Sequence, residues 1–165
     1  MTSPILSYLS FLFSATNQHG VHSPFIYDYV TKCLYHKHRL KLPITLKILV
    51  KSIVYFKYGT VRLLGEDQVT KDIIQQHIPN ISFTESNTEI VYGSISDLHS
   101  HNFEISTLGN NSMLLVDGIH KNGSSLDSWK TLKEQEHVRV TVDLFYCGVV
   151  FFRKEQVKEH FKIRI

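Results

Sequence analysis

The sequence predicts an α/β fold, in which helices cover both faces of a mostly parallel sheet. Apolar residues at helical spacing alternate along the chain with short apolar runs that end in glycine or polar residues. Every residue between Ser112 and Asp117 is apolar, which is typical of strands that are buried on both faces of a parallel sheet. In such folds, ligands bind at the carboxyl ends of the strands. We therefore look for functional residues where the predicted strands end.

Composition and length indicate one ordinary globular domain. The chain has 165 residues, of which 42% are hydrophobic and 20% charged. We expect a helical extension over residues 1–57 and an α/β core over residues 58–165. No apolar run approaches the ~20 residues of a membrane span, and no signal-peptide pattern is found. Cys33 and Cys147 show no metal-ligand spacing, so we expect free thiols and a cytoplasmic protein.

Three helices are expected in the extension. Residues 4–14 carry apolar side chains at helical spacing and no charge, which predicts a short, very apolar helix. Ser23-Pro24 is typical of an N-cap followed by proline at the first helical position. Pro43 opens the third helix, with Lys47 and Lys51 opposite its apolar stripe. Because a soluble monomer rarely leaves such an apolar surface open, we expect the first helix to pair with a second copy or another subunit.

The predicted core contains one junction that does not suit a parallel sheet. The strands expected in the core are at 61–65, 81–84, 90–92, 112–117, 138–145 and 148–153. The helices expected there are at 67–77 and 124–132, with a helical turn at 154–160. Only four residues separate Glu85 from Ile90, whereas a parallel crossover needs about a dozen. We therefore expect that 81–84 and 90–92 are not consecutive parallel strands of one sheet. Either they form an antiparallel hairpin or one of them lies outside the sheet.

Both ends of the chain resemble a known family. The segment from Tyr8 to Tyr35, centred on SATNQHGVHSPF, and the segments 140–143, 148–156 and 160–164 resemble a bacterial group of class I S-adenosylmethionine-dependent methyltransferases with a helical N-terminal extension. The resemblance covers roughly half of the chain. It implies a Rossmann-like, mostly parallel sheet with helices on both faces and a C-terminal antiparallel strand pair.

The same resemblance implies where the cofactor would bind. In the family, the first strand ends in an acid and a glycine-rich loop; here Gly65 matches a glycine, while Leu64 replaces the acid. Glu66 and Asp67 occupy the turn, where they would repel the carboxylate of the cofactor. The acid that binds the ribose hydroxyls corresponds to Glu85, about twenty residues further on. S-Adenosylmethionine is thus the implied cofactor, held by Gly65 and Glu85. The alternatives are a turn that starts a helix and a solvated carboxylate.

The family's acid–base region is also reduced. Relatives carry a further βα unit and an Asp-Gly-Asn-His segment after the position of Glu85, and this sequence lacks both. Where relatives have Asp-Asp-Ile-His-Trp-Ser, residues 117–122 are DGIHKN. The resemblance implies Asp117 and His120 as catalytic candidates, with His120 as general base. A single carboxylate is too little for Mg²⁺, so no metal site is predicted. His120 could instead be a packing or capping residue.

Two other patterns suggest binding sites. Histidines cluster at 19–22, 36–38 and 99–101, but no third ligand has suitable spacing for zinc. From Tyr29 to Gly65 there are basic residues and no Asp or Glu, a distribution that can attract nucleic acid. This stretch lacks the interleaved aromatic residues of single-strand binders. A solvated basic face is the alternative.

The sequence therefore predicts a methyltransferase-family protein that has lost efficient catalysis and acts as a binding or interaction module in a homo-oligomer. An active methyltransferase on an unidentified small molecule is the first alternative. A nucleic-acid-binding protein that uses residues 29–65 is the second.

Overall fold

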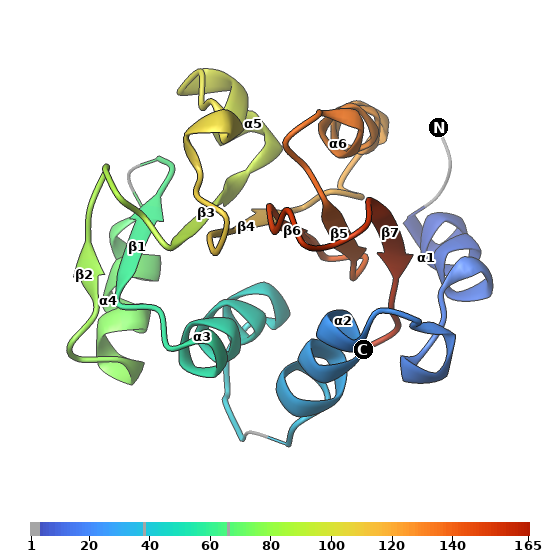
Figure 1. Ribbon diagram of the computed structural model, residues 1–165, viewed down its shortest axis with the longest axis horizontal. Coiled ribbons are helices and arrows are strands. Elements are labelled where there is room, and N and C mark those ends of the chain that lie inside the picture. Colours follow the sequence, from blue (N-terminus) through green and yellow to red (C-terminus); the bar gives the residue numbers. More distant parts are fainter. Residues whose placement is uncertain (1–3, 38, 66) are drawn as a thin grey trace.

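A seven-stranded sheet lies between two layers of helices in the computed structural model, which describes residues 4–37, 39–65 and 67–165 (Figure 1). The strands are β1 (Thr60–Leu63), β2 (Ser82–Phe83), β3 (Ile90–Ser94), β4 (Met113–Asp117), β5 (Val140–Asp143), β6 (Cys147–Phe151) and β7 (Glu159–Lys162). The α-helices are α1 (Pro4–Ser14), α2 (Pro24–Asp28), α3 (Ile44–Phe56), α4 (Gln68–His77), α5 (Ile95–Ser100) and α6 (Gly123–Glu134). Short helical segments η1 (Gln18–Gly20), η2 (Tyr29–Leu34) and η3 (Ile105–Thr107) complete the set, and η2 is a π-helix that continues α2.

The strand order is β2-β1-β3-β4-β6-β5-β7. Pairing is parallel between β1 and β2, β1 and β3, β3 and β4, and β5 and β7. Strand β6 runs antiparallel to both of its neighbours, β4 and β5. The Rossmann-like, mostly parallel sheet and the C-terminal antiparallel pair β5–β6 are thus confirmed.

The prediction for strands 81–84 and 90–92 was wrong. Strands β2 and β3 both belong to the sheet and both run parallel to β1, one on each side of it. The short link is long enough because β2 has only two residues. Phe83 pairs with Val61, and Ile90 pairs with Val61 as well, so the chain starts β3 at the level where it left β2. The chain therefore does not run back along the sheet between the two strands. In an ordinary parallel crossover, that return path is what requires the additional residues.

Glu89 fixes this link at the start of β1. Its Oε2 accepts hydrogen bonds from the amides of Gly59, at 2.6 Å, and Thr60, at 2.9 Å. The Thr60 hydroxyl donates to the same oxygen at 3.1 Å. The Glu89 carboxylate thus holds the short link, residues 84–89, against the start of β1.

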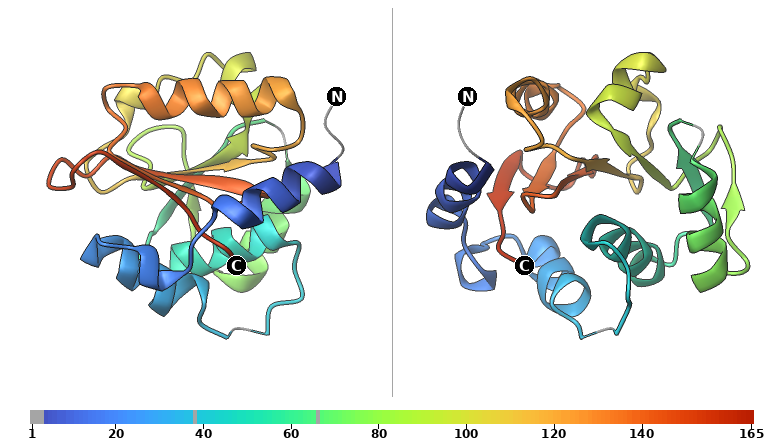
Figure 2. Two further views of the ribbon diagram at one scale, coloured as in Figure 1. Left: turned by 90° about the vertical axis from the view of Figure 1, so that its right-hand side faces the viewer. Right: turned by 180° about the vertical axis from the view of Figure 1, so that it is seen from behind.

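Each face of the sheet has its own hydrophobic core. On one face, α2, η2, α3 and α4 pack through Tyr29, Leu49 and Ile74, which are fully buried (Figures 1 and 2). On the other face, α5 and α6 pack through Leu98 and Trp129. The two cores cover both faces of the central strands, as expected for the apolar run that forms β4.

Helix α1 lies beside the β7 edge of the sheet rather than in either layer, as all three ribbon views show (Figures 1 and 2). The segment that follows α1 is tied to β7, because the amide of Thr16 donates to the carbonyl oxygen of Lys162 at 2.8 Å. Among the described residues, no helix is long and apolar enough to cross a membrane.

Several local predictions are confirmed and others need correction. Residues 4–14 are helical, and the Ser23 side chain caps α2. Helix α6 starts one residue earlier than expected, capped by Asn122, whose Oδ1 accepts from the amide of Ser125 at 2.8 Å. Lys51 does not face solvent: it is buried, and its Nζ donates to the carbonyl oxygen of Leu34 at 2.5 Å. The expected helical turn at 154–160 is a non-helical turn that leads into β7, and α5 was not predicted.

Candidate functional site

The two predicted cofactor residues line one pocket. Gly65 follows β1, Glu85 follows β2, and both border a cavity of about 580 Å³ at the carboxyl ends of these strands. Gly65 has φ +88°, a left-handed conformation that side chains rarely adopt. Glu85 is exposed, and its backbone oxygen accepts from the Arg62 guanidinium at 3.0 Å. This arrangement leaves the Glu85 carboxylate able to meet a hydroxylated ligand, while its role as a ribose ligand stays a prediction.

Charged side chains of both signs line the same pocket. Asp67 lines it and caps α4, since its Oδ1 accepts from the amide of Thr70 at 3.0 Å. Arg62 and Lys71 line it as well. A ligand carboxylate would therefore meet cations beside the Asp67 carboxylate, but the start of α4 already has its acceptor. The prediction for Glu66 falls outside the described residues.

Leu64, predicted to stand where the resemblance implies an acid, follows β1 directly. It is buried, and its side chain fills the space beside Gly93, where an added Cβ would lie 2.8 Å from the Leu64 Cβ. The side chain belongs to the core under α5. This position contributes packing and offers no polar group to a ligand.

Asp117 is the last residue of β4, and its carboxylate is hydrogen-bonded within the protein. Its Oδ1 accepts from the hydroxyl of Thr45, near the start of α3, at 2.7 Å. Burial, and then the carboxylates of Asp117 and Asp67, raise the pKa of the neighbouring Tyr92 well above its ordinary value.

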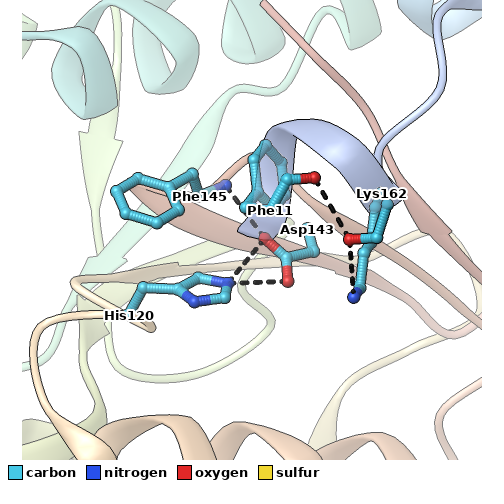
Figure 3. Close-up of polar contacts among 6 residues, drawn as sticks. Phe11, His120, Asp143, Phe145 and Lys162 are labelled. Carbon is cyan, nitrogen blue, oxygen red and sulfur yellow. Dashed lines mark hydrogen bonds and ion pairs between the residues drawn. The ribbon is translucent and has the colours of Figure 1, made fainter. Parts of the chain in front are cut away.

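His120 has a different partner from the one that the sequence suggested. Its Nε2 lies 2.8 Å from Oδ2 and 3.1 Å from Oδ1 of Asp143, at the end of β5 (Figure 3). The imidazole stacks on the Phe145 ring at 4.8 Å between centroids, with an interplanar angle of 19°, and meets the edge of Phe11. Asp117 and His120 are therefore held by separate partners, and a joint catalytic role stays untested.

Asp143 also shapes the turn between β5 and β6. Phe145 has φ +68°, a strained conformation for an aromatic residue, and its amide donates to Oδ1 of Asp143 at 2.9 Å. The carboxylate thus orients the imidazole and the ring that stacks on it. Sequence reasoning missed Asp143 because the predicted strand ran from 138 to 145, which placed this carboxylate inside the strand, whereas β5 ends at Asp143.

His120 and Asp143 line a cavity of about 330 Å³ between α1, α6 and β7. This cavity shares no lining residue with the pocket of Gly65 and Glu85. The predicted cofactor residues and the predicted general base are therefore on separate pockets.

The remaining patterns show no assembled site. Within the described ranges, no three His, Cys, Asp or Glu side chains are grouped closely enough to hold a metal ion; His38 of the 36–38 cluster falls outside these ranges. In the basic stretch, Lys32 pairs with Asp28 at 2.8 Å, and the Arg62 guanidinium lies over the Phe103 ring. Several of its cations thus serve the fold, and nucleic-acid binding stays a prediction.

Comparison with known proteins finds similarity among solved structures. No protein-family model and no curated protein matches the sequence. Among solved structures, the chain is similar to a Staphylococcus aureus protein provisionally named as a caffeoyl-CoA O-methyltransferase, with a TM-score of 0.47 and 10% sequence identity. The match covers 89% of this chain and 99% of that chain. The assignment of the fold rests on the strand order and pairing of this chain itself.

Proposed function

We propose that this chain is a methyltransferase-like domain that acts as a binding and interaction module without efficient methyl transfer. One observation carries the proposal: the cofactor candidates Gly65 and Glu85 line one pocket, and the general-base candidate His120 lines another with no common wall. Methyl transfer gains its rate from holding donor and acceptor in line. Residues on separate pockets do not provide that alignment.

The pocket between β1 and β2 retains the features of a nucleoside site. Glu85 offers a carboxylate to ribose hydroxyls, and the Phe83 side chain forms part of the same wall. Asp67 already caps α4 from within the pocket, so the Thr70 amide at the start of this helix is not free for the methionine carboxylate. We therefore expect the nucleoside to provide most of the affinity, and the methionyl group to add little.

Calorimetric titration of the full chain with S-adenosylmethionine and with adenosine tests this function. We expect S-adenosylmethionine to bind more weakly than about 100 μM, which corresponds to about 5.5 kcal/mol, and adenosine to bind comparably. Glu85→Ala should abolish both signals, whereas Glu136→Ala, a change at another exposed glutamate, should preserve them. Tight binding of S-adenosylmethionine that Glu85→Ala removes, with measurable methylation of small phenols or acids, would instead establish the active enzyme. Absence of binding by both compounds would refute the nucleoside site.

The interaction surface in this proposal is the outer face of α1. Ile5, Leu9 and Phe13 are 71%, 43% and 89% exposed, while Tyr8 and Phe11 on the inner face pack against Phe145. Helix α1 contains no charged residue, so two copies can approach about a two-fold axis without repulsion between like charges. Burial of such a surface is favourable. We therefore propose a homodimer through α1.

Sedimentation analysis tests the dimer. The native chain should be dimeric at micromolar concentration, and the double change Ile5→Ser and Phe13→Ser should give a monomer with an unchanged circular dichroism spectrum. Val69→Ser provides the matched control, because Val69 is 70% exposed and lies in α4, at the opposite edge of the sheet from α1 (Figure 1). A monomeric native chain, or equal effects of the two sets of changes, would rule out α1 as the interface.

A further inference from the structure

We propose that the cavity between α1, α6 and β7, here called the α1–α6 pocket, binds a small organic acid with an apolar body. The pocket holds about 330 Å³, at the lower end of the range for small-molecule sites. It is separate from the pocket of Gly65 and Glu85 and does not depend on the nucleoside proposal. Its walls combine cationic, apolar and hydrogen-bonding groups.

The charge of the pocket favours an anion. Lys130, Lys133 and Lys162 all border it. The carboxylate in the wall, that of Asp143, is already engaged by His120 and by the Phe145 amide. Its charge opposes an incoming carboxylate, but the three ammonium groups in the wall outnumber it.

The partner of Lys162 is a neutral hydroxyl, and the partner of Lys130 is an exposed carboxylate. Lys162 donates from Nζ to the Ser14 hydroxyl at 3.1 Å (Figure 3). Lys130 pairs with Asp127 at 2.9 Å, but both side chains are more than half exposed. Exposed ion pairs of this kind are weak and easily exchanged. An anion in the pocket can therefore recruit both ammonium groups at low cost.

Trp129 supplies a buried donor that lacks a partner. It forms part of the pocket wall and is 1% exposed, and its Nε1 has no hydrogen-bond acceptor among the described residues. The six-membered ring of the indole is fixed on Gly148, where an added Cβ would lie 2.4 Å from Cη2. Because Nε1 is itself buried, a ligand in the pocket lies against the indole without bonding to this nitrogen. The indole therefore serves as a rigid part of the wall that senses the ligand.

Apolar side chains define the rest of the ligand. Leu6 and Phe11 of α1 face Leu126 of α6 across the pocket. A ring or short aliphatic body between them would be removed from water, which is favourable. The pocket thus suits a compound of the size of benzoate, with its charge toward the lysines.

Tryptophan fluorescence tests this proposal directly, because Trp129 is the only tryptophan in the sequence. Benzoate serves as the probe, and benzamide, which has nearly the same shape but no charge, serves as its control. We expect a saturable change in emission with benzoate, and affinity for benzamide at least about tenfold lower. In a ¹H–¹⁵N spectrum, the single indole N–H signal should shift with benzoate, because the ligand ring lies against the indole.

Lysine variants locate the site. Lys133→Gln and Lys162→Gln should each weaken benzoate binding by about fivefold or more and leave benzamide unchanged. Lys154→Gln, at an exposed lysine outside the pocket, should have no effect. The proposal fails if benzoate gives no saturable change at millimolar concentration. It also fails if benzamide binds equally well, or if the three variants behave alike.

Discussion

The Nε2 atom of His120 lies 2.8 Å from Oδ2 of Asp143, and the two side chains are only 10% and 7% exposed. The contact joins the loop after β4 to the end of β5, across the intervening strand β6. Phe11 of α1 packs against the same imidazole. The pair therefore links the helix at the edge of the sheet to the carboxyl ends of the strands.

Removal of this buried carboxylate should destabilise the protein strongly. Asp143→Ala leaves His120 Nε2 and the Phe145 amide without their acceptor, so we expect a loss of about 3 kcal/mol in the free energy of unfolding. Urea denaturation followed by circular dichroism measures it. Asp127→Ala is the control, because Asp127 pairs with Lys130 at the surface and should cost no more than about 0.5 kcal/mol. Similar losses for the two variants would contradict a structural role for the buried pair.

The contact between Gly148 and Trp129 should not tolerate a methyl group. A Cβ at Gly148 would lie 2.4 Å from Cη2 of Trp129, so Gly148→Ala forces the indole or β6 to move. We expect a loss of at least about 2 kcal/mol in the free energy of unfolding, measured by urea denaturation. Gly123→Ala is the matched change, since a Cβ there meets nothing within 4 Å at the start of α6. If Gly148→Ala were as stable as Gly123→Ala, the packing of Trp129 on β6 would be wrong.

Glu89 should be essential for the short link between β2 and β3. Glu89→Ala removes the acceptor of two backbone amides and one hydroxyl at the start of β1. We expect a loss of about 2 kcal/mol, measured as a shift of the thermal midpoint together with the enthalpy. Glu85→Ala, in the same link but with an exposed side chain, should leave stability within about 0.5 kcal/mol. An equal effect at the two positions would argue against the anchoring role of Glu89.

Alkaline pH should destabilise the fold through its buried thiols. Burial raises the pKa of Cys33 from 9.0 to about 12 and also raises the pKa of Cys147. Above pH 9 the unfolded chain therefore loses protons that the folded chain retains, so stability falls as pH rises toward 12. Each such thiol adds up to about 1.4 kcal/mol per pH unit to the slope.

Urea denaturation at several pH values between 9 and 12 measures this slope. Cys33→Ala should make the slope of stability against pH shallower by the contribution of one thiol. The variant also loses stability because it leaves a small cavity, but this loss does not depend on pH. A free energy of unfolding that is constant over this range, or a slope unchanged in Cys33→Ala, would show that Cys33 ionises alike in the folded and unfolded chains.

Local signals in the sequence were sufficient for many of the elements. The apolar period of residues 4–14, the Ser23 cap and the continuous apolar run of β4 depend on neighbours along the chain, and the structure has each of them. Lys51 shows the limit of such signals. Helical spacing placed it opposite the apolar stripe, but η2 covers that side of α3 and accepts its Nζ at the carbonyl oxygen of Leu34.

The sequence by itself determined the alternation of helices and strands, the mostly parallel sheet and the presence of Gly65, Glu85, Asp117 and His120 after predicted strands. Only the tertiary structure decided which of them meet. The partner of a strand-end side chain depends on strand order, and β6 returns between β4 and β5, so that His120 reaches Asp143 instead of Asp117. Strand order likewise placed β1 between β2 and β3, because a two-residue strand removes the need for a long crossover. Such contacts join residues far apart along the chain, and no local pattern encodes them.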